Sequence, residues 1–110
     1  LENALAIPAT TVDVLVLTNT GLKAFPKEIE KFTNIKELWL GHNEIAALPA
    51  SIWKLTLLKK IDLSHNKLTQ LPKEMGQIKN LKVLNLSNNN FAQKEQERIK
   101  AQLTGVEVGF

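Results

Sequence analysis

The sequence contains no cysteine, which excludes a disulfide, a thiolate metal site and a cysteine nucleophile. It has no apolar run near the about 20 residues that a membrane span needs, and no basic-then-apolar start typical of a signal peptide. Lack of cysteine suits an intracellular protein and is equally compatible with an exported bacterial one. The chain begins at Leu1 rather than Met, so a removed leader or a longer parent protein stays open, and the localisation is unknown.

The composition is that of one globular domain. Of its 110 residues, 44% are hydrophobic and 23% are charged, which is ordinary for a folded protein. The net charge of +3 is a mild basic excess in a chain that also holds eleven carboxylates. We therefore expect a mixed, solvated surface and no nucleic-acid partner.

A 23-residue repeat runs through most of the chain. Its copies begin at Val12, Ile35, Leu58 and Leu81. Two of them read IKELWLGHNEIAALPASIWKLTL and LKKIDLSHNKLTQLPKEMGQIKN. Apolar residues recur at positions 1, 4, 6, 11, 14, 18 and 21 of the period, and proline stands at position 15 of the three complete copies. Seven apolar sites in each copy define one continuous core.

The spacing within a copy predicts how the chain runs. Alternation at positions 4 and 6, as in Leu38-Trp39-Leu40, has the period of two that is typical of a strand. Proline then ends any strand and leads into a short helical or extended return. A strand this short cannot bury its apolar face alone, so the copies must stack, with their strands in a parallel sheet.

This pattern resembles the leucine-rich repeat proteins, whose motif LxxLxLxxNxLxxLPxxIxxLxx is matched by residues 35–57 and 58–80. In particular, it is similar to the short bacterial repeats that pathogenic spirochaetes encode in numbers. The resemblance covers residues 12–91 and implies an α/β solenoid, a short right-handed coil with a parallel sheet on its concave face. It also implies a binding role towards proteins. Bacterial members are often exported to meet host molecules, so the resemblance alone suggests a secreted or cell-surface protein.

Both ends of a solenoid need caps. We expect a single domain, 1–110, with an N-terminal cap 1–11, repeats 12–34, 35–57, 58–80 and 81–91, and a C-terminal cap 92–110. Residues 1–7 suit a short capping helix that stops before Pro8. After Phe91, the spacing of Glu95, Ile99 and Leu103 predicts an amphipathic helix, Gly105 suits a left-handed C-cap, and residues 106–110 alternate as a final strand.

An asparagine stands at position 9 of three copies: Asn43, Asn66 and Asn89. At this position the chain turns off the strand and leaves backbone groups pointing inward. An amide side chain carries both donors and an acceptor, so we predict a structural asparagine ladder. Thr20 holds this position in the first copy, where we expect the ladder to be weaker.

Positions 3, 5 and 7 must point away from the core, which places Trp39 on the open face. A lone surface aromatic can simply pack over its neighbours. However, Val14 and Val16 should lie on the adjacent strand, and Gly41 should leave space beside the indole. Because tryptophan is often a binding hot spot, we predict a partner-binding patch around it. Its predicted members are Val14, Val16, Glu37, Trp39, Lys60, Asp62, Val83 and Asn85.

Two further columns have alternative interpretations. His42 and His65 at position 8 should form a polar rim. A zinc site usually needs at least three protein ligands, and only Asp62 or Glu44 could complete one, so we expect no metal and no cofactor. Position 2 holds Asp13, Lys36, Lys59 and Lys82, where a solvated edge is favoured over an anionic ligand site. For Trp53 and Leu57, packing across the return segments is favoured over a second contact surface.

Catalysis finds little support in these motifs. Ser64 and His65 are consecutive, so their side chains diverge and do not form a nucleophile–base pair. We therefore predict a non-enzymatic module that binds a protein ligand on its concave sheet, as a monomer or weak homodimer. The alternatives are a self-associating structural protein, or a metal- or anion-binding protein that uses His42 and His65 or the lysine column.

Overall fold

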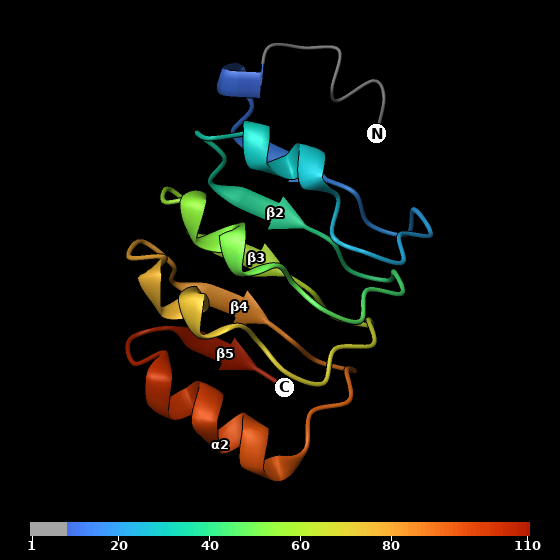
Figure 1. Cartoon of the computed structure of the whole chain (residues 1–110), viewed down its shortest axis with the longest axis vertical. Helices are drawn as coiled ribbons and strands as arrows, with labels where there is room; N and C mark the ends of the chain where they lie inside the picture. Colours follow the sequence, from blue (N-terminus) through green and yellow to red (C-terminus); the bar gives the residue numbers. More distant parts are fainter. Residues whose placement is uncertain (1–8) are drawn as a thin grey trace.

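The computed structural model describes residues 9–110 as a stack of coils (Figure 1). The capping helix expected over residues 1–7 lies outside the described residues. A 3-10 turn, η1 (Ala9–Thr11), precedes the first strand. The strands are β1 (Val14–Val16), β2 (Glu37–Trp39), β3 (Lys60–Asp62), β4 (Val83–Asn85) and β5 (Glu107–Gly109).

The strands form one parallel sheet in the order β1-β2-β3-β4-β5. Each residue of β1, β2 and β3 pairs with the residue 23 positions later in the next strand, as Leu15 does with Leu38. Residues of β4 pair with residues 24 positions later in β5, as Val83 does with Glu107. The central residue of each of the first four strands is buried, because a period of two turns only that side chain inward. The predicted solenoid with a parallel sheet is therefore confirmed.

The return segments are short 3-10 helices, η2 (Lys27–Lys31), η3 (Ala50–Lys54) and η4 (Lys73–Gln77). Each begins directly after a proline in extended conformation, at Pro26, Pro49 and Pro72. Proline needs no hydrogen-bond acceptor for its nitrogen and has its φ fixed. Its carbonyl accepts an i to i+3 bond, such as Ile52 N–H to Pro49 O at 3.2 Å, which is the 3-10 pattern.

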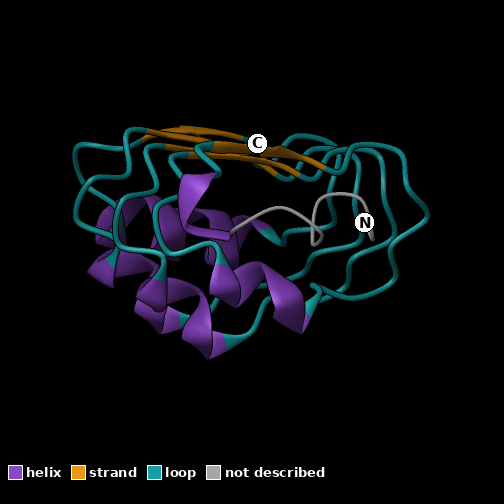
Figure 2. Cartoon of the chain, turned by 90° about the horizontal axis from the view of Figure 1, so that it is seen from above, coloured by secondary structure: helices purple, strands orange, loops and turns teal. Residues whose placement is uncertain are grey.

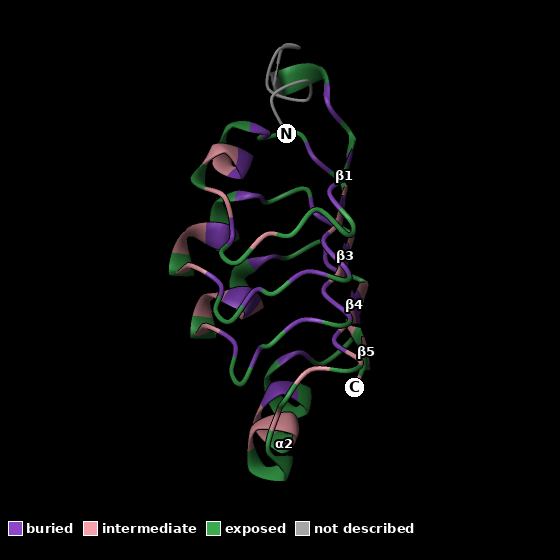
Figure 3. Ribbon diagram, turned by 90° about the vertical axis from the view of Figure 1, so that its right-hand side faces the viewer, coloured by how far each residue is buried: buried purple, intermediate pink, exposed green. Residues whose placement is uncertain are grey.

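Helices and strands lie in two layers, with the helices on one face of the sheet (Figure 2). The apolar residues of the repeat fill the space between these layers and form one core. Figure 3 shows the buried residues on the inner sides of both layers. Phe32, Leu38, Leu55 and Leu63, for example, are completely buried. The other face of the sheet has no covering layer among residues 9–110.

Asn43, Asn66 and Asn89 connect successive coils through their side-chain amides. Asn66 Nδ2 donates to carbonyl oxygens of its own coil and, at 2.9 Å, to Leu40 O of the preceding one. Its Oδ1 accepts from Ile45 N–H at 3.0 Å. Asn43 and Asn89 repeat this arrangement. In the first coil, Thr20 donates its hydroxyl to Leu17 O at 2.8 Å.

The C-terminal end is closed by the helix α2 (Gln93–Gln102) followed by β5. Ile99 and Leu103 of this region are buried, and Gly105 adopts a left-handed φ of 83°. The helix and strand therefore agree with the prediction from the sequence. Finally, the rings of Phe91 and Phe110 meet edge to face, with centroids 5.7 Å apart.

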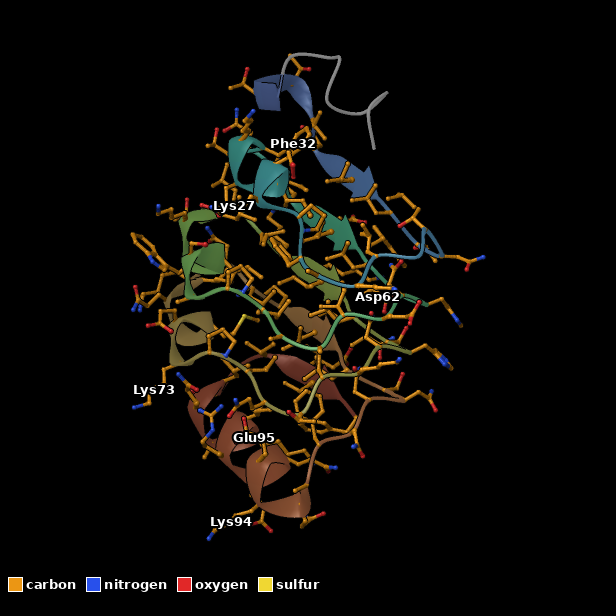
Figure 4. The ribbon with its side chains drawn as sticks, turned by 45° about the vertical axis from the view of Figure 1, so that its right-hand side comes forward. Lys27, Phe32, Asp62, Lys73, Lys94 and Glu95 are labelled. Carbon is orange, nitrogen blue, oxygen red and sulfur yellow. The ribbon has the colours of Figure 1, made fainter. Side chains whose placement is uncertain are left out.

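An ion pair attaches α2 to the third coil. Glu95, labelled in Figure 4, accepts hydrogen bonds from Arg98 Nη2 at 2.7 Å and from Leu71 N–H at 3.2 Å. Arg98 Nη2 also donates to Leu71 O at 2.9 Å. The Arg98 hydrogen bond lowers the pKa of Glu95, and the same contact raises the pKa of Arg98. Glu95 thus faces the coil although it is charged, because Arg98 and the backbone N–H of Leu71 both donate hydrogen bonds to it.

Candidate functional site

The open face of the sheet is lined by two columns of side chains that run across the strands. Pairing places Val14, Glu37, Lys60, Val83 and Glu107 in one column. The second column consists of Val16, Trp39, Asp62, Asn85 and Gly109. All eight residues predicted for the partner-binding patch are thus brought together on one face. The contributions of β5, Glu107 and Gly109, were not predicted, because the register of the last strand does not follow from the repeat.

Trp39 is half-buried and held by two charged neighbours. Its Nε1–H donates a hydrogen bond to Glu37 Oε1 at 3.0 Å. The ammonium of Lys60, on the next strand, lies 4.3 Å from the ring centroid, within cation–π range. One face of the indole is therefore occupied by a cation of the protein itself, and the side chain is fixed rather than free on the surface.

Exposed apolar surface is concentrated at the β1 end of the face. Val14 is 47% and Val16 is 62% exposed. Val16 pairs directly with Trp39, so the apolar area continues from β1 to the indole. The N-terminal part of the face is consequently more apolar than the C-terminal part.

Asp62 and Asn85 also have a structural role, since each closes the turn after its strand. Asp62 Oδ1 accepts a hydrogen bond from Ser64 N–H at 2.9 Å, and Asn85 Oδ1 accepts one from Ser87 N–H at 3.1 Å. Figure 4 shows Asp62 on the side of the molecule opposite Lys27 and Lys73 on the helices. Part of the hydrogen-bonding capacity of these two predicted site residues is therefore already used by their own turns.

The prediction for Gly41 was wrong. A Cβ atom at Gly41 would lie 3.1 Å from Ser64 Oγ and 3.3 Å from Asp62 Oδ2. Gly41 is buried and Ser64 is only 7% exposed, although position 7 was expected to point outward. The backbone turns off the strand after position 5, so the space over Gly41 is filled by side chains of the next coil and not left beside the indole.

A shallow hollow of about 310 Å³ lies at the other end of the face, between β4 and β5. Its wall includes Lys60 and Glu107, which carry opposite charges, and Val83. Gly109 contributes no side chain where the other strands of its column have one. The missing side chain leaves room beside Asn85.

His42 and His65 are stacked, with ring centroids 4.1 Å apart and planes 11° from parallel. Asn88 Nδ2 lies 3.2 Å from His65 Nε2. All four residues at position 8, including Asn19, have a left-handed backbone with φ between 55° and 59°. Asparagine and histidine are enriched in this conformation, a signal that the sequence interpretation missed. Among residues 9–110, no group of three or more His, Asp or Glu side chains could hold a metal ion.

Comparisons with known proteins identify the fold family. A family profile described as "Leucine rich repeat" matches residues 10–68, and one described as "Leucine Rich repeats (2 copies)" matches residues 56–96. The chain therefore belongs to the leucine-rich repeat proteins. Domains of this family are typically non-enzymatic modules that bind proteins. None of the helices in residues 9–110 has the length and apolar character that crossing a membrane requires.

Solved structures agree with this assignment. A leucine-rich repeat protein of Leptospira interrogans is 42% identical over 80% of this chain, with a TM-score of 0.77. The LRIM1/APL1C complex and the leucine-rich repeat domain of APL1B match at 24% and 23% identity, with TM-scores of 0.75 and 0.73. These two cover 88% and 87% of this chain and show the fold alone.

In turn, this chain spans 22% of the Leptospira protein, 19% of the matched chain in the LRIM1/APL1C complex and 30% of the APL1B domain. No curated protein sequence matches it. The similarity to the Leptospira protein confirms the predicted likeness to short bacterial leucine-rich repeats.

Proposed function

We propose that this protein is a non-enzymatic module that binds a protein ligand on the open face of its sheet. The observation that carries the proposal is the position of Trp39. The other strands place Val16, Asp62, Asn85 or Gly109 at this point, and only β2 has a large aromatic ring there. The ring lies outside the core and is held by two charged neighbours.

The contacts of Trp39 would favour binding in two ways. A ring already held by Glu37 and Lys60 loses little side-chain freedom when a ligand covers it, which lowers the entropic cost of association. The apolar surface that continues from the ring to Val16 would give a ligand a contact area without water. Lys60 and Asp62 would supply charges that fix the ligand's orientation. A ligand residue could also enter the hollow beside Gly109.

The test is a pull-down with parent and Trp39→Ala protein in parallel, followed by affinity measurement for any partner found. Truncation of a tryptophan hot spot costs about 2 kcal/mol or more, which corresponds to a loss of affinity of roughly 30-fold. Trp53→Ala is the matched control, since Trp53 lies on η3 and not on the sheet. A partner that binds both variants as tightly as the parent would remove Trp39 from the site.

Self-association is the second candidate, and the exposure of Val14 and Val16 favours it. Both belong to β1, which ends the order of strands, and an exposed edge strand can pair with another chain. Light scattering over a range of protein concentrations tests this candidate. A molar mass that stays at that of one chain at every concentration would reject it.

The resemblance to spirochaetal repeats further implies that the protein is exported and that its ligand is a host molecule. Detection of the protein in culture medium, compared with the cell lysate, would test export. Export would then direct the search for a partner to host extracts. Retention inside the cell would direct it to proteins of the same cell.

A further inference from the structure

Three short segments lead from η2, η3 and η4 into the following strands, on the left in Figure 1. We call residues 31–36, 54–59 and 77–82 the lysine edge. These segments contain six lysines and no carboxylate: Lys31, Lys36, Lys54, Lys59, Lys79 and Lys82. The rest of the chain has eight Lys and Arg against eleven Asp and Glu. The positive charge of the protein is therefore gathered on one edge.

The backbone holds three of these lysines in a row. Lys59 N–H donates to Lys36 O and Lys82 N–H donates to Lys59 O, both at 2.8 Å. Like charges on directly adjacent strands repel one another. All six lysines are exposed. Of these six, only Lys54 has a carboxylate of residues 9–110 within 4.0 Å, that of Glu30. The row continues with an acidic residue at each end, Asp13 beside Lys36 and Glu107 beside Lys82. The repulsion is therefore centred on Lys59, and an anionic surface would relieve it.

Trp53 and Leu57 add apolar surface to this basic edge. Trp53 is 38% exposed and Leu57 is 36% exposed. At the position of Trp53, the neighbouring complete copies have Glu30 and Gly76. At the position of Leu57, they have Asn34 and Asn80. Asn34 Nδ2 donates to Thr10 O at 2.9 Å, and Asn80 Nδ2 makes the same bond to Thr56 O at 3.0 Å. A leucine cannot make this bond. At Leu57, the middle copy thus replaces a coil-to-coil hydrogen bond with an exposed apolar side chain.

We propose that the lysine edge, with Trp53 and Leu57, docks on the surface of an anionic lipid bilayer. Lysines near a membrane are attracted by acidic headgroups, and tryptophan favours the boundary between headgroups and acyl chains. A soluble polyanion would satisfy the lysines but offers no apolar phase for Trp53 and Leu57. The docked edge lies beside the open face, not on it, so this interaction goes beyond the proposed protein binding and does not depend on it.

Co-sedimentation of the full 110-residue chain with vesicles tests the proposal. The vesicles are phosphatidylcholine alone, or phosphatidylcholine mixed with phosphatidylserine. We expect binding to the second kind only. Lys59→Gln with Lys82→Gln should weaken it roughly 25-fold, at about fivefold for each lysine. Lys23→Gln with Lys94→Gln removes the same charge from exposed positions outside the edge and should weaken it much less.

The apolar part is tested by Leu57→Asn alone and by Leu57→Asn combined with Trp53→Ala. Leu57→Asn introduces the residue of the neighbouring complete copies and so should fold. The double variant should bind about tenfold more weakly or worse, since burial of a tryptophan and a leucine each contributes to binding. In a Trp39→Phe background Trp53 is the remaining tryptophan. Its fluorescence should shift to the blue on phosphatidylserine vesicles and stay unchanged with polyphosphate.

Three results would overturn the proposal. The first is equal binding to both kinds of vesicle, or to neither. The second is a Trp53→Ala, Leu57→Asn variant that binds phosphatidylserine vesicles as strongly as the parent. The third is an unshifted Trp53 emission on vesicles combined with tighter binding to polyphosphate, which would assign the edge to a soluble polyanion. None of these results bears on the ligand of the open face.

Discussion

The ammonium of Lys60 lies 4.3 Å from the centre of the Trp39 ring, across two adjacent strands of the sheet. This contact fixes the half-buried indole on the surface of the sheet. Together with the Glu37 hydrogen bond, it sets the direction in which the indole stands on the open face. In the proposed binding mode, a ligand would meet a ring with one occupied side and one defined orientation.

Lys60→Gln should lower the free energy of unfolding by about 0.5–1 kcal/mol, the worth of an exposed cation–π contact. Urea unfolding followed by fluorescence measures it. Lys59→Gln is the control, because the neighbouring Lys59 is exposed on the edge and its loss relieves repulsion. Equal destabilisation by both changes would show that the Trp39 contact contributes nothing.

Asn66→Leu should destabilise the protein by at least about 2 kcal/mol. It leaves Ile45 N–H without its acceptor, at about 1–3 kcal/mol for a buried group. It also removes the Asn66 hydrogen bond to Leu40 O, which keeps only its bond from Asn43 Nδ2. Thermal unfolding measures the loss. Asn90→Leu changes an exposed asparagine one position beyond the ladder and should have little effect. An Asn66→Leu melt that matches the parent would contradict the structural ladder.

His65→Val should cost about 1–2 kcal/mol more than His65→Asn. The backbone of His65 has a φ of 55°, and a left-handed conformation is costly for a residue with a branched Cβ. Asparagine occupies the same conformation at Asn19 and Asn88. Both variants lose the stacking with His42, so their difference in urea unfolding isolates the backbone. Equal stability of the two would reject backbone strain as the reason for this residue choice.

Leu57→Asn should stabilise the free protein by about 0.5–1.5 kcal/mol, the net worth of one hydrogen bond. The new amide would donate to Thr33 O, as Asn80 does to Thr56 O. A higher midpoint in urea, with an unchanged slope, is the expected result. If the midpoint falls, Leu57 contributes to packing across the return segments, the role favoured from the sequence.

Glu95→Gln should lower stability at neutral pH by about 1 kcal/mol, since it breaks the ion pair with Arg98 while keeping an acceptor for Leu71 N–H. The pKa of Glu95 is lowered in the folded protein by the Arg98 hydrogen bond. This contribution is therefore fully present above the unfolded pKa and is lost as pH falls through the folded one. Urea unfolding at several pH values should show parent and variant converging in acid, whereas Glu97→Gln, exposed on the same helix, should follow the parent throughout.

Much of the fold follows from the repeat. The positions of Leu38 and Leu40, Pro49 and Asn43 predict a strand, a turn and a return of fixed length, and the period alone sets the register between copies. Gly105 and the spacing of Ile99 and Leu103 likewise predict the end of the C-terminal helix. These features are local, because strand alternation, proline and glycine act on the backbone of their own segment.

The sequence by itself therefore determined the stacking of the coils and the face on which Trp39 stands. Only the tertiary structure decided what surrounds it there: Lys60 over the ring, Asp62 bound to its own turn, and Gly41 closed in by Ser64. Side-chain contacts between coils depend on rotamers and on where the chain leaves each strand, and a repeat pattern fixes neither. A periodic sequence specifies which residues are neighbours, and the packed structure specifies how they touch.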